Sequence, residues 1–320
     1  MKTKIIATLG PSTFRENKIK ELEKRDIAIF RLKSSYYSGS QLEKEVERIR
    51  KISKTPLMVD LEGPELRLRC KKEFSFKKGA EFVAGFSKKD NISFNHDFYE
   101  QITMKHNFIF DKGVGHLRIL RKKDGKIWLK TLNDIRIKDG KGVNLKERVL
   151  ETSSLSERDK ELIKIINKKR VEYVAYSYPR RKEDIENLKL HLNKKTKIFS
   201  KIENKHALEN LKDITELSDG IIVARGDLAV ETSLEQIPIL QKKIISFANK
   251  YKKPVVVATE LIESMVNKKM PTRAEVDDIE NCIFEGADLL LLTDETAVGK
   301  YPILTVDTVN KIIKTADRYK

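Results

Sequence analysis

One lysine and two carboxylates stand close together in the stretch KIFSKIENKHALENLKDITELSDGIIVARGD, residues 197–227. Lys201 and Glu203 end a short extended run, and Asp227 ends a second β-rich run, GIIVARGD. Apolar residues at helical spacing fill the segment between the two runs. Parallel strands joined by a helix lie next to or near each other, with their carboxyl ends on one edge of the sheet. We therefore expect the three side chains to face one crevice, which could hold a divalent metal and a phosphorylated anion.

Ion pairs are the alternative explanation of these residue types. Lysines and carboxylates at the rim of a sheet also pair with one another simply to stabilise the fold. The spacing of Lys201, Glu203 and Asp227 by itself leaves both interpretations open.

Strand-like and helix-like segments alternate through most of the chain. Apolar, β-branched runs predict strands at residues 4–9, 27–32, 56–61, 173–178, 197–203, 220–227, 254–260 and 289–293. Apolar residues at helical spacing predict helices at residues 16–24, 41–53, 156–169, 183–193, 207–217, 239–250, 273–285 and 304–319. Eight strand–helix units with very apolar strands are typical of the α/β fold called the (β/α)8 or TIM barrel.

The alternation stops between residues 68 and 142. Short alternating segments, with turns at Lys78-Gly79 and Asp124-Gly125, predict a small antiparallel β-domain there. We therefore expect a catalytic barrel of residues 1–67 and 143–320, with residues 68–142 inserted after strand three. An insertion at that point lies at the catalytic end of a barrel, where it could close over a site as a lid.

The composition excludes several classes of protein. The net charge of +17 arises from 65 basic residues interspersed with 48 acidic ones. No nucleic-acid-binding motif occurs, so we expect a solvated, lysine-rich surface and no nucleic-acid partner. The chain has no apolar run of about 18 residues, which predicts no membrane span. Two cysteines, Cys70 and Cys282, and an N-terminus unlike a signal peptide indicate a cytoplasmic protein.

Eight short runs, in order along the whole chain, closely resemble the pyruvate kinase family. They are TKIIATLGP (3–11), DLEGPELR (60–67), KGVNL (141–145), SKIEN (200–204), DGIIVARGDL (219–228), VVVATELIESM (255–265), PTRAE (271–275) and DETAVGKYP (294–302). The inserted β-domain would then match the family's mobile B domain, somewhat shortened. The family's C-terminal domain, which carries allosteric sites in many members, has no counterpart in this sequence.

The resemblance implies roles for the residues of the crevice. Lys201 would stabilise the phosphoryl group in flight and the enolate left behind, and Glu203 and Asp227 would be ligands of Mg²⁺ or Mn²⁺. These roles fit the expected geometry, because phosphoryl transfer depends mostly on positioning and on neutralisation of charge.

The resemblance implies further site residues. Ala224, Arg225 and Gly226, with Asp227, would form a turn whose amides bind the substrate carboxylate. Thr259 would contact the substrate and help to relay a proton to the enolate. The other implied residues are Arg31, a catalytic group on the phosphate path, Ser177 on the substrate side, and Arg67, Lys141 and Pro11 around the nucleotide and its phosphates.

The sequence departs from the family after the second strand. The family's Arg-Leu-Asn-Phe-Ser-His-Gly is here RLKSSYY, residues 31–37. In the family the asparagine, here Lys33, ligates K⁺ together with the residues matched by Ser35 and Asp60. Because an ammonium group is a compact positive charge, we expect Lys33 to replace the ion, so that activity does not require K⁺. The alternative is that Lys33 points to solvent and the cation site is lost.

Other departures touch the nucleotide side and the surroundings of the pocket, at Tyr36, Tyr37, Glu62, Glu260, Thr293 and Asp294.

Three functions stay open. The first is a pyruvate kinase-like phosphotransferase that moves phosphate from phosphoenolpyruvate to ADP, giving pyruvate and ATP. The second is a divergent enzyme that keeps this site but uses another nucleotide, another acceptor or carbon–carbon chemistry on the enolate. The third is a non-catalytic regulatory relative. The expected assembly is a homodimer through the barrel, with a monomer as the alternative.

Overall fold

The computed structural model describes residues 3–87, 89–110, 113–145 and 151–319. It divides the chain into two compact units, Met1–Glu62 with Glu157–Lys320, and Gly63–Ser156. The second unit extends beyond the expected residues 68–142 because its flanking segments are bonded within it. The side-chain amide of Asn95 donates to the carbonyl of Glu65 at 2.8 Å, and the hydroxyl of Thr152 donates to the carbonyl of Pro64 at 3.2 Å.

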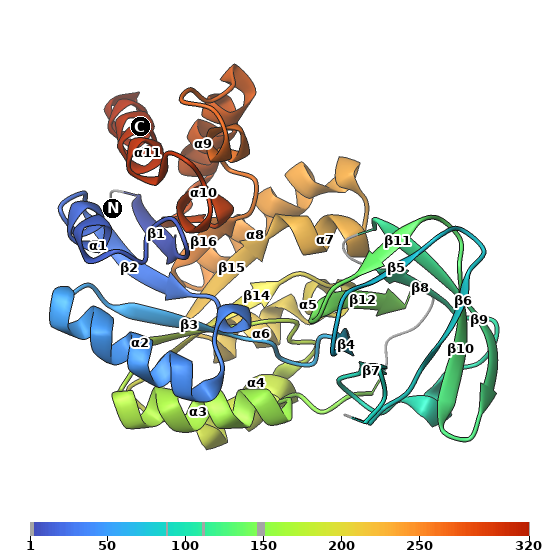
Figure 1. Cartoon of the computed structure of the whole chain (residues 1–320). Helices are drawn as coiled ribbons and strands as arrows, with labels where there is room; N and C mark the ends of the chain where they lie inside the picture. Colours follow the sequence, from blue (N-terminus) through green and yellow to red (C-terminus); the bar gives the residue numbers. More distant parts are fainter. Residues whose placement is uncertain (1–2, 88, 111–112, 146–150, 320) are drawn as a thin grey trace. The chain divides into compact units, whose positions relative to one another are not determined.

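Eight parallel strands form a closed barrel in the first unit (Figure 1). Around the barrel their order is β1-β17-β16-β15-β14-β13-β3-β2. This finding confirms the predicted (β/α)8 barrel. The strands are β1 (Lys4–Leu9), β2 (Ile27–Leu32), β3 (Leu57–Leu61), β13 (Tyr173–Tyr176), β14 (Lys197–Ile202), β15 (Gly220–Ala224), β16 (Val255–Ala258) and β17 (Leu289–Leu292).

The inside of the barrel is filled by apolar side chains from all eight strands. They form one cluster of Ile6, Ile29, Met58, Ala175, Phe199, Ile222, Val256, Ala258 and Leu291. Phe199 fits because its neighbour Gly220 has no side chain, and a Cβ there would lie 2.4 Å from the Phe199 ring. Close packing of this kind fixes the strands against one another, and with them the residues at their carboxyl ends.

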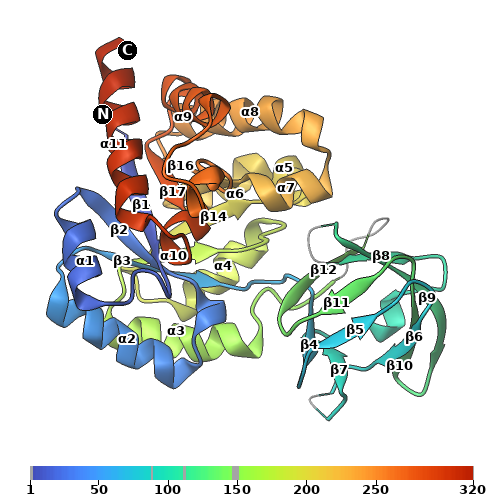
Figure 2. The ribbon, with the colours of Figure 1, turned by 45° about the horizontal axis from the view of Figure 1, so that its top comes forward.

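Helices surround the strands (Figure 2). They are α1 (Glu16–Glu23), α2 (Gly39–Ile52), α3 (Glu157–Lys169), α4 (Lys182–His191), α5 (Lys205–Glu209), α6 (Leu211–Leu217), α7 (Arg225–Glu231), α8 (Ile237–Lys250), α9 (Arg273–Glu285), α10 (Asp294–Ala297) and α11 (Pro302–Tyr319). Short 3₁₀ turns lie at η1 (Ser34–Tyr36), η3 (Leu234–Gln236) and η4 (Glu263–Val266). The single helix predicted at residues 207–217 is two helices, because the chain leaves helical geometry at Asn210.

Capping residues define the ends of the helices that matter for the site. In α9, the hydroxyl of Thr272 accepts the N–H of Glu275, the Glu275 carboxylate accepts the N–H of Thr272, and Gly286 ends the helix with φ of +100°. A reciprocal cap of this kind satisfies free amides at the start of a helix, and a glycine adopts positive φ without strain.

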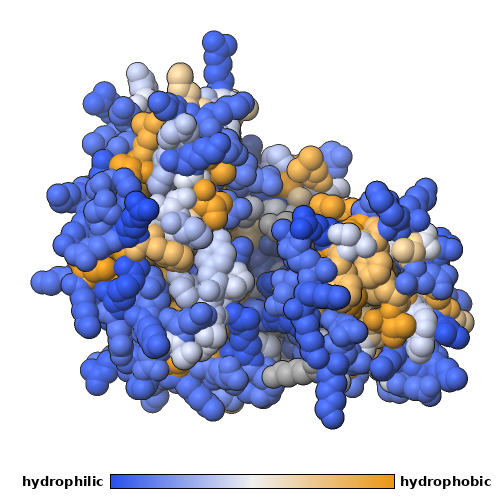
Figure 3. Space-filling model, viewed as in Figure 1, coloured by the Kyte–Doolittle hydropathy of each residue, from blue (hydrophilic) through white to orange (hydrophobic). Residues whose placement is uncertain are grey.

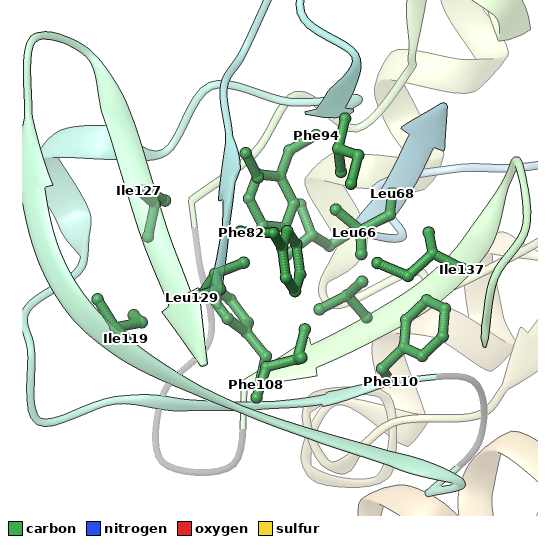
Figure 4. Packing of buried hydrophobic residues seen from close by; sticks show 14 of the residues in the cluster. Leu66, Leu68, Phe82, Phe94, Phe108, Phe110, Ile119, Ile127, Leu129 and Ile137 are labelled. Carbon is green, nitrogen blue, oxygen red and sulfur yellow. The ribbon is translucent and has the colours of Figure 1, made fainter. Parts of the chain in front are cut away.

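The second unit is built from short antiparallel strands. A sheet has the order β6-β10-β9-β8-β12-β4-β7, and β11 pairs with β5. The elements are β4 (Arg67–Cys70), β5 (Phe74–Phe76), β6 (Glu81–Ala84), β7 (Ile92–Phe94), η2 (Tyr99–Gln101), β8 (Asn107–Phe110), β9 (Gly115–Lys123), β10 (Lys126–Thr131), β11 (Ile135–Ile137) and β12 (Lys141–Leu145). The sheet encloses its own apolar core, in which Phe82, Phe94 and Phe108 pack with aliphatic side chains (Figure 4).

Hydrophilic residues cover most of the visible surface, as expected for a lysine-rich chain (Figure 3). Within the described residues, no helix is both long and apolar enough to span a membrane.

Candidate active site at the carboxyl edge of the barrel

Lys201 lies near the carboxyl end of β14 and contacts residues from two other strands. Its Nζ lies 3.2 Å from Oδ2 of Asp60, which belongs to β3, and donates to Oγ of Ser177, which follows β13, at 2.9 Å. The strands β3, β13 and β14 are consecutive in the barrel. Their carboxyl ends therefore bring together three side chains that are far apart in the sequence.

Arg31, near the end of β2, binds the same carboxylate. Its Nε donates to Oδ1 of Asp60 at 3.0 Å, and its Nη2 donates to Oδ2. Its Nη1 donates to Oγ1 of Thr8 at 3.1 Å, and the Thr8 hydroxyl donates to the carbonyl of Leu292 at 2.7 Å. A planar guanidinium suits this two-point contact with a carboxylate. Arg31 therefore ties the ends of β1, β2 and β3 together.

The charges in this cluster are fixed at neutral pH. Burial opposes the negative charge of Asp60, but Arg31 and Lys201 outweigh it and hold the pKa of Asp60 well below its usual range. Burial also opposes the positive charge of Lys201, but Asp60, Glu203 and Asp227 outweigh it and raise the pKa of Lys201. Lys201 is therefore an ammonium group at neutral pH, held beside a carboxylate.

Two carboxylates that act on Lys201 could hold a divalent metal. Glu203, one residue beyond β14, is buried, and its Oε1 accepts the backbone N–H of Tyr178 at 2.8 Å. Asp227 lies in the first turn of α7. In the part of the chain that the structure describes, no three His, Cys, Asp or Glu side chains form a complete ligand set. The pair fits Mg²⁺, which is often bound by one or two carboxylates and completes its shell with water and phosphate oxygens.

The extended run expected at residues 220–227 ends earlier, at Ala224. Arg225, Gly226 and Asp227 form the first turn of α7 instead, so the strand passes directly into a helix. Ala224 at the N-cap has no side-chain group to bond the first amides of this helix. These amides follow β15, which pairs with β14, and so lie at the same edge as Lys201.

The strand expected at residues 254–260 also ends early. β16 stops at Ala258, and the next two residues, Thr259 and Glu260, have φ of +76° and +53°. This left-handed region is a genuine outlier for a β-branched residue, with a cost on the order of 1–3 kcal/mol. Such strain persists only where the surroundings hold it, and it is concentrated at functional sites.

Three residues were expected to form or replace a monovalent-cation site, and the structure describes the surroundings of each. Asp60 is bound by Arg31 and Lys201. The ammonium of Lys33 lies 5.6 Å from the centroid of the Tyr36 ring, and Ser35 is exposed in η1. The positive charges next to Asp60 therefore come from β2 and β14.

Asp294, the first residue of α10, adds a negative charge on the side of the site nearest β1 and β17. Burial and the carboxylate of Asp294 together raise the pKa of Tyr36. The same carboxylate contributes to the raised pKa of Arg31, after the larger effects of burial, which lowers it, and of Asp60, which raises it. Both Tyr36 and Asp294 are departures from the family pattern, and they lie within electrostatic reach of each other.

The remaining expected site residues are distributed over both units. Pro11 is exposed in the turn after β1. Arg67 and Lys141 belong to the second unit, where they lie in β4 and β12. Arg67 donates to the carbonyl of Gly140 at 2.6 Å and forms an ion pair with Glu65.

Comparison with known proteins decides the family. The family model described as pyruvate kinase, barrel domain, matches residues 1–306. The chain belongs to the pyruvate kinase family. The pyruvate kinase of Thermotoga maritima is 36% identical over 335 residues, an alignment that covers 99% of this chain and 71% of that protein. The pyruvate kinase of Methanocaldococcus jannaschii is 38% identical over 324 residues, covering 99% of this chain and 70% of that protein.

Membership of the pyruvate kinase family supports a pyruvate kinase-like function, that of a phosphotransferase. The structure also adds contacts that the sequence did not indicate: Thr8 beside Arg31, the Tyr178 amide on Glu203, and Asp278 beside Arg225. No local signal marks these residues, because their partners lie 23 to 53 positions away in the chain.

Proposed function

We propose that this chain catalyses Mg²⁺-dependent phosphoryl transfer from phosphoenolpyruvate to ADP, giving pyruvate and ATP. The observation that carries the proposal is the charged Lys201, held by Asp60 and Ser177 next to two further carboxylates at the carboxyl edge of the barrel. Active sites of TIM barrels lie at this edge. Family membership supports the same reaction class.

Lys201 is the principal catalytic group of the proposal. Its ammonium neutralises negative charge on the phosphoryl group during transfer and on the enolate of pyruvate that remains. It is preorganised for this work, because Asp60 and Ser177 fix its position before substrate arrives. Glu203 and Asp227 would hold the metal, which supplies further positive charge for the phosphate oxygens when bound (Mn²⁺ could serve equally).

The enolate must gain a proton at its methylene carbon to become pyruvate. We assign the relay of this proton to Thr259, which follows β16 next to the turn that begins α7. The amides of residues 224–227 would bind the substrate carboxylate, which places the methylene group between that turn and Thr259. Ser177 would line the substrate side through its bond to Lys201.

The phosphates of the nucleotide would be bound by cationic residues. Arg31 is a buried guanidinium at the barrel edge, and we assign Arg67, Lys141 and Pro11 to the nucleotide and its phosphates. Asp294 favours a second candidate, an enzyme that keeps the phosphoenolpyruvate site but uses a different nucleotide or acceptor. A carboxylate within electrostatic reach of Arg31 and Tyr36 repels phosphate groups, so it disfavours a highly charged acceptor.

We further propose that activity does not require K⁺. Asp60 matches a residue that ligates K⁺ in the family, and its negative charge is neutralised by Arg31 and Lys201. Lys33 supplies a third positive charge, in the loop after β2.

We also propose that the chain forms a homodimer through the barrel. Light scattering tests this directly, and a monomeric mass would contradict it.

The decisive experiment measures pyruvate release from phosphoenolpyruvate with Mg²⁺ and ADP, GDP, UDP or CDP in turn. Rapid release that requires ADP supports the proposed reaction. Release that requires another nucleotide supports the second candidate. Phosphoenolpyruvate binding without any release contradicts the proposed reaction with ADP and points to an acceptor other than these nucleotides. Glu203→Gln should raise the Mg²⁺ concentration needed for half-maximal activity, whereas Glu209→Gln, on the exposed side of α5, should not.

A further inference from the structure

The guanidinium of Arg225 is bound by groups of the protein itself, although the resemblance placed this residue in the turn whose amides bind the substrate. Its Nε and Nη2 donate to the carbonyl of Thr259 at 3.1 and 2.7 Å, and Nη2 also donates to the carbonyl of Glu260 at 3.0 Å. Its Nη1 donates to both carboxylate oxygens of Asp278, at 2.9 and 2.7 Å, and to Oε1 of Gln241 at 3.3 Å.

These contacts use the whole hydrogen-bonding capacity of the guanidinium. An arginine side chain has five N–H donors, and here they make six hydrogen bonds, so at least one donor is shared. The side chain is 11% exposed. A substrate carboxylate could be bound by Arg225 only if one of these bonds were given up.

The two carbonyls that Arg225 holds belong to the strained residues of the site. Thr259 and Glu260 are consecutive residues in the left-handed region, with φ of +76° and +53°. A β-branched residue leaves that region unless its surroundings hold it there. The fork of Arg225 supplies three hydrogen bonds to this short segment, from a helix that begins directly beside it.

Asp278 and Gln241 anchor the other side of the fork. Asp278 belongs to α9, whose start is fixed by the cap at Thr272, and the buried Gln241 belongs to α8 and donates to Glu285 at 2.9 Å. The guanidinium therefore links three helices to the loop after β16. Its position is determined by rigid elements, which is what a group that orients a site requires.

We propose that Arg225 is a positioning residue that holds the Thr259–Glu260 segment in its left-handed conformation and thereby aims the Thr259 side chain at the substrate. The effect on turnover rests on the proposed function, in which Thr259 relays the proton. The effect on the backbone does not depend on that function, so the two can be tested separately.

The backbone test compares Arg225→Lys with Arg25→Lys. Arg25 is a matched control, because it also binds an aspartate through two nitrogens and a backbone carbonyl, at Asp307 and Glu21, before β2 begins. Hydrogen–deuterium exchange of residues 255–265 should be faster in Arg225→Lys and unchanged in Arg25→Lys. Unchanged exchange in Arg225→Lys would overturn the proposal, whether or not the protein is active.

The turnover test uses a double-mutant cycle. We expect Arg225→Lys to lower kcat by up to about 100-fold, with the KM for phosphoenolpyruvate changed little, because a small misplacement of a reacting group has an effect of that size. Asp278→Asn should give a smaller loss of the same kind. If Arg225 acts through Thr259, the double variant Arg225→Lys/Thr259→Ala should be no slower than Thr259→Ala alone. If the kcat losses of the two single variants multiply in the double variant, the positioning role of Arg225 is contradicted. An inactive wild-type protein would contradict the proposed function, and the exchange test would still decide the positioning role.

Discussion

The ammonium of Lys201 lies 3.2 Å from Oδ2 of Asp60, on the carboxylate that also receives the guanidinium of Arg31. One buried carboxylate thus holds two cations, both of which contact its Oδ2. Because Arg31 and Lys201 together carry one more charge than Asp60, the cluster has a net positive charge at the edge where the proposed substrate would bind.

Replacing Lys201 removes the cation that the proposed reaction needs most. We expect Lys201→Met to lower kcat for pyruvate release by about 100- to 1,000-fold, the usual loss when one preorganised charge-stabilising group is removed. Lys197→Met is the matched control, since Lys197 lies at the other end of the same strand and pairs with Asp219 at 3.0 Å. Steady-state kinetics of both variants would check the prediction, and equal losses would contradict it.

Replacing Asp60 leaves two buried cations without their carboxylate. We expect Asp60→Asn to lower the free energy of unfolding by about 3–5 kcal/mol, as is usual when one partner of a buried ion pair is removed. The control Asp307→Asn breaks a partly exposed pair with Arg25 and should change stability by at most about 1 kcal/mol. Urea unfolding monitored by circular dichroism measures both values.

The contribution of Asp60 should also depend on pH. Because the folded protein lowers the pKa of this carboxyl group, its contribution is present above the ordinary pKa of about 3.9 and is lost as the pH falls toward the folded pKa. The stability difference between wild type and Asp60→Asn should therefore be constant from pH 5 to 7 and become smaller below about pH 4. If the stability difference between wild type and Asp60→Asn increased in acid, the lowered pKa of Asp60 would be contradicted.

The proposal that activity does not require K⁺ can be tested by replacing Lys33. The wild-type protein should have similar activity in KCl and NaCl, because the loop after β2 carries its own fixed positive charge. Lys33→Asn should gain a several-fold stimulation by K⁺. Lys269→Asn is the control, because the ammonium of Lys269 also lies over a tyrosine ring, 5.8 Å from the centroid of Tyr301. Strong stimulation of the wild-type protein by K⁺ would refute the assignment.

Glu263, in η4, should make the stability of the protein depend on pH in the opposite direction. Partial burial and the carboxylates of Glu295, Asp294, Glu260 and Glu275 raise the pKa of Glu263 to about 7. The folded protein then binds a proton that the unfolded chain has already lost, so stability falls as the pH rises from the ordinary glutamate value toward 7.

Glu263→Gln should remove this loss. We expect it to raise the melting temperature at pH 8 and to change it little near pH 5. The gain should stay below about 1 kcal/mol, because the side chain is only partly buried and solvent screens its charge. Glu216→Gln, on α6, provides a glutamate control outside this group of carboxylates. A gain at pH 5 that equals the gain at pH 8 would contradict the titration of Glu263.

The sequence by itself determined the barrel and the approximate place of its strand ends. The strands are buried, apolar runs and the helices have apolar residues at helical spacing, so local periodicity is enough to recognise both. Since all eight strands are parallel, the ends of neighbouring strands must meet at one edge. That rule placed Lys201, Glu203 and Asp227 together before any contact was known.

Only the tertiary structure decided which partners these residues have. Arg31 and Asp60 are 29 positions apart, and Arg225 and Asp278 are 53 apart, so no local pattern could pair them. The contacts of Arg31 and Lys201 with Asp60 follow from the barrel, whose register brings the ends of β2 and β14 to that carboxylate. The left-handed backbone at Thr259 also had no sequence signal, since a threonine adopts it only when distant groups, here the guanidinium of Arg225, hold its carbonyl.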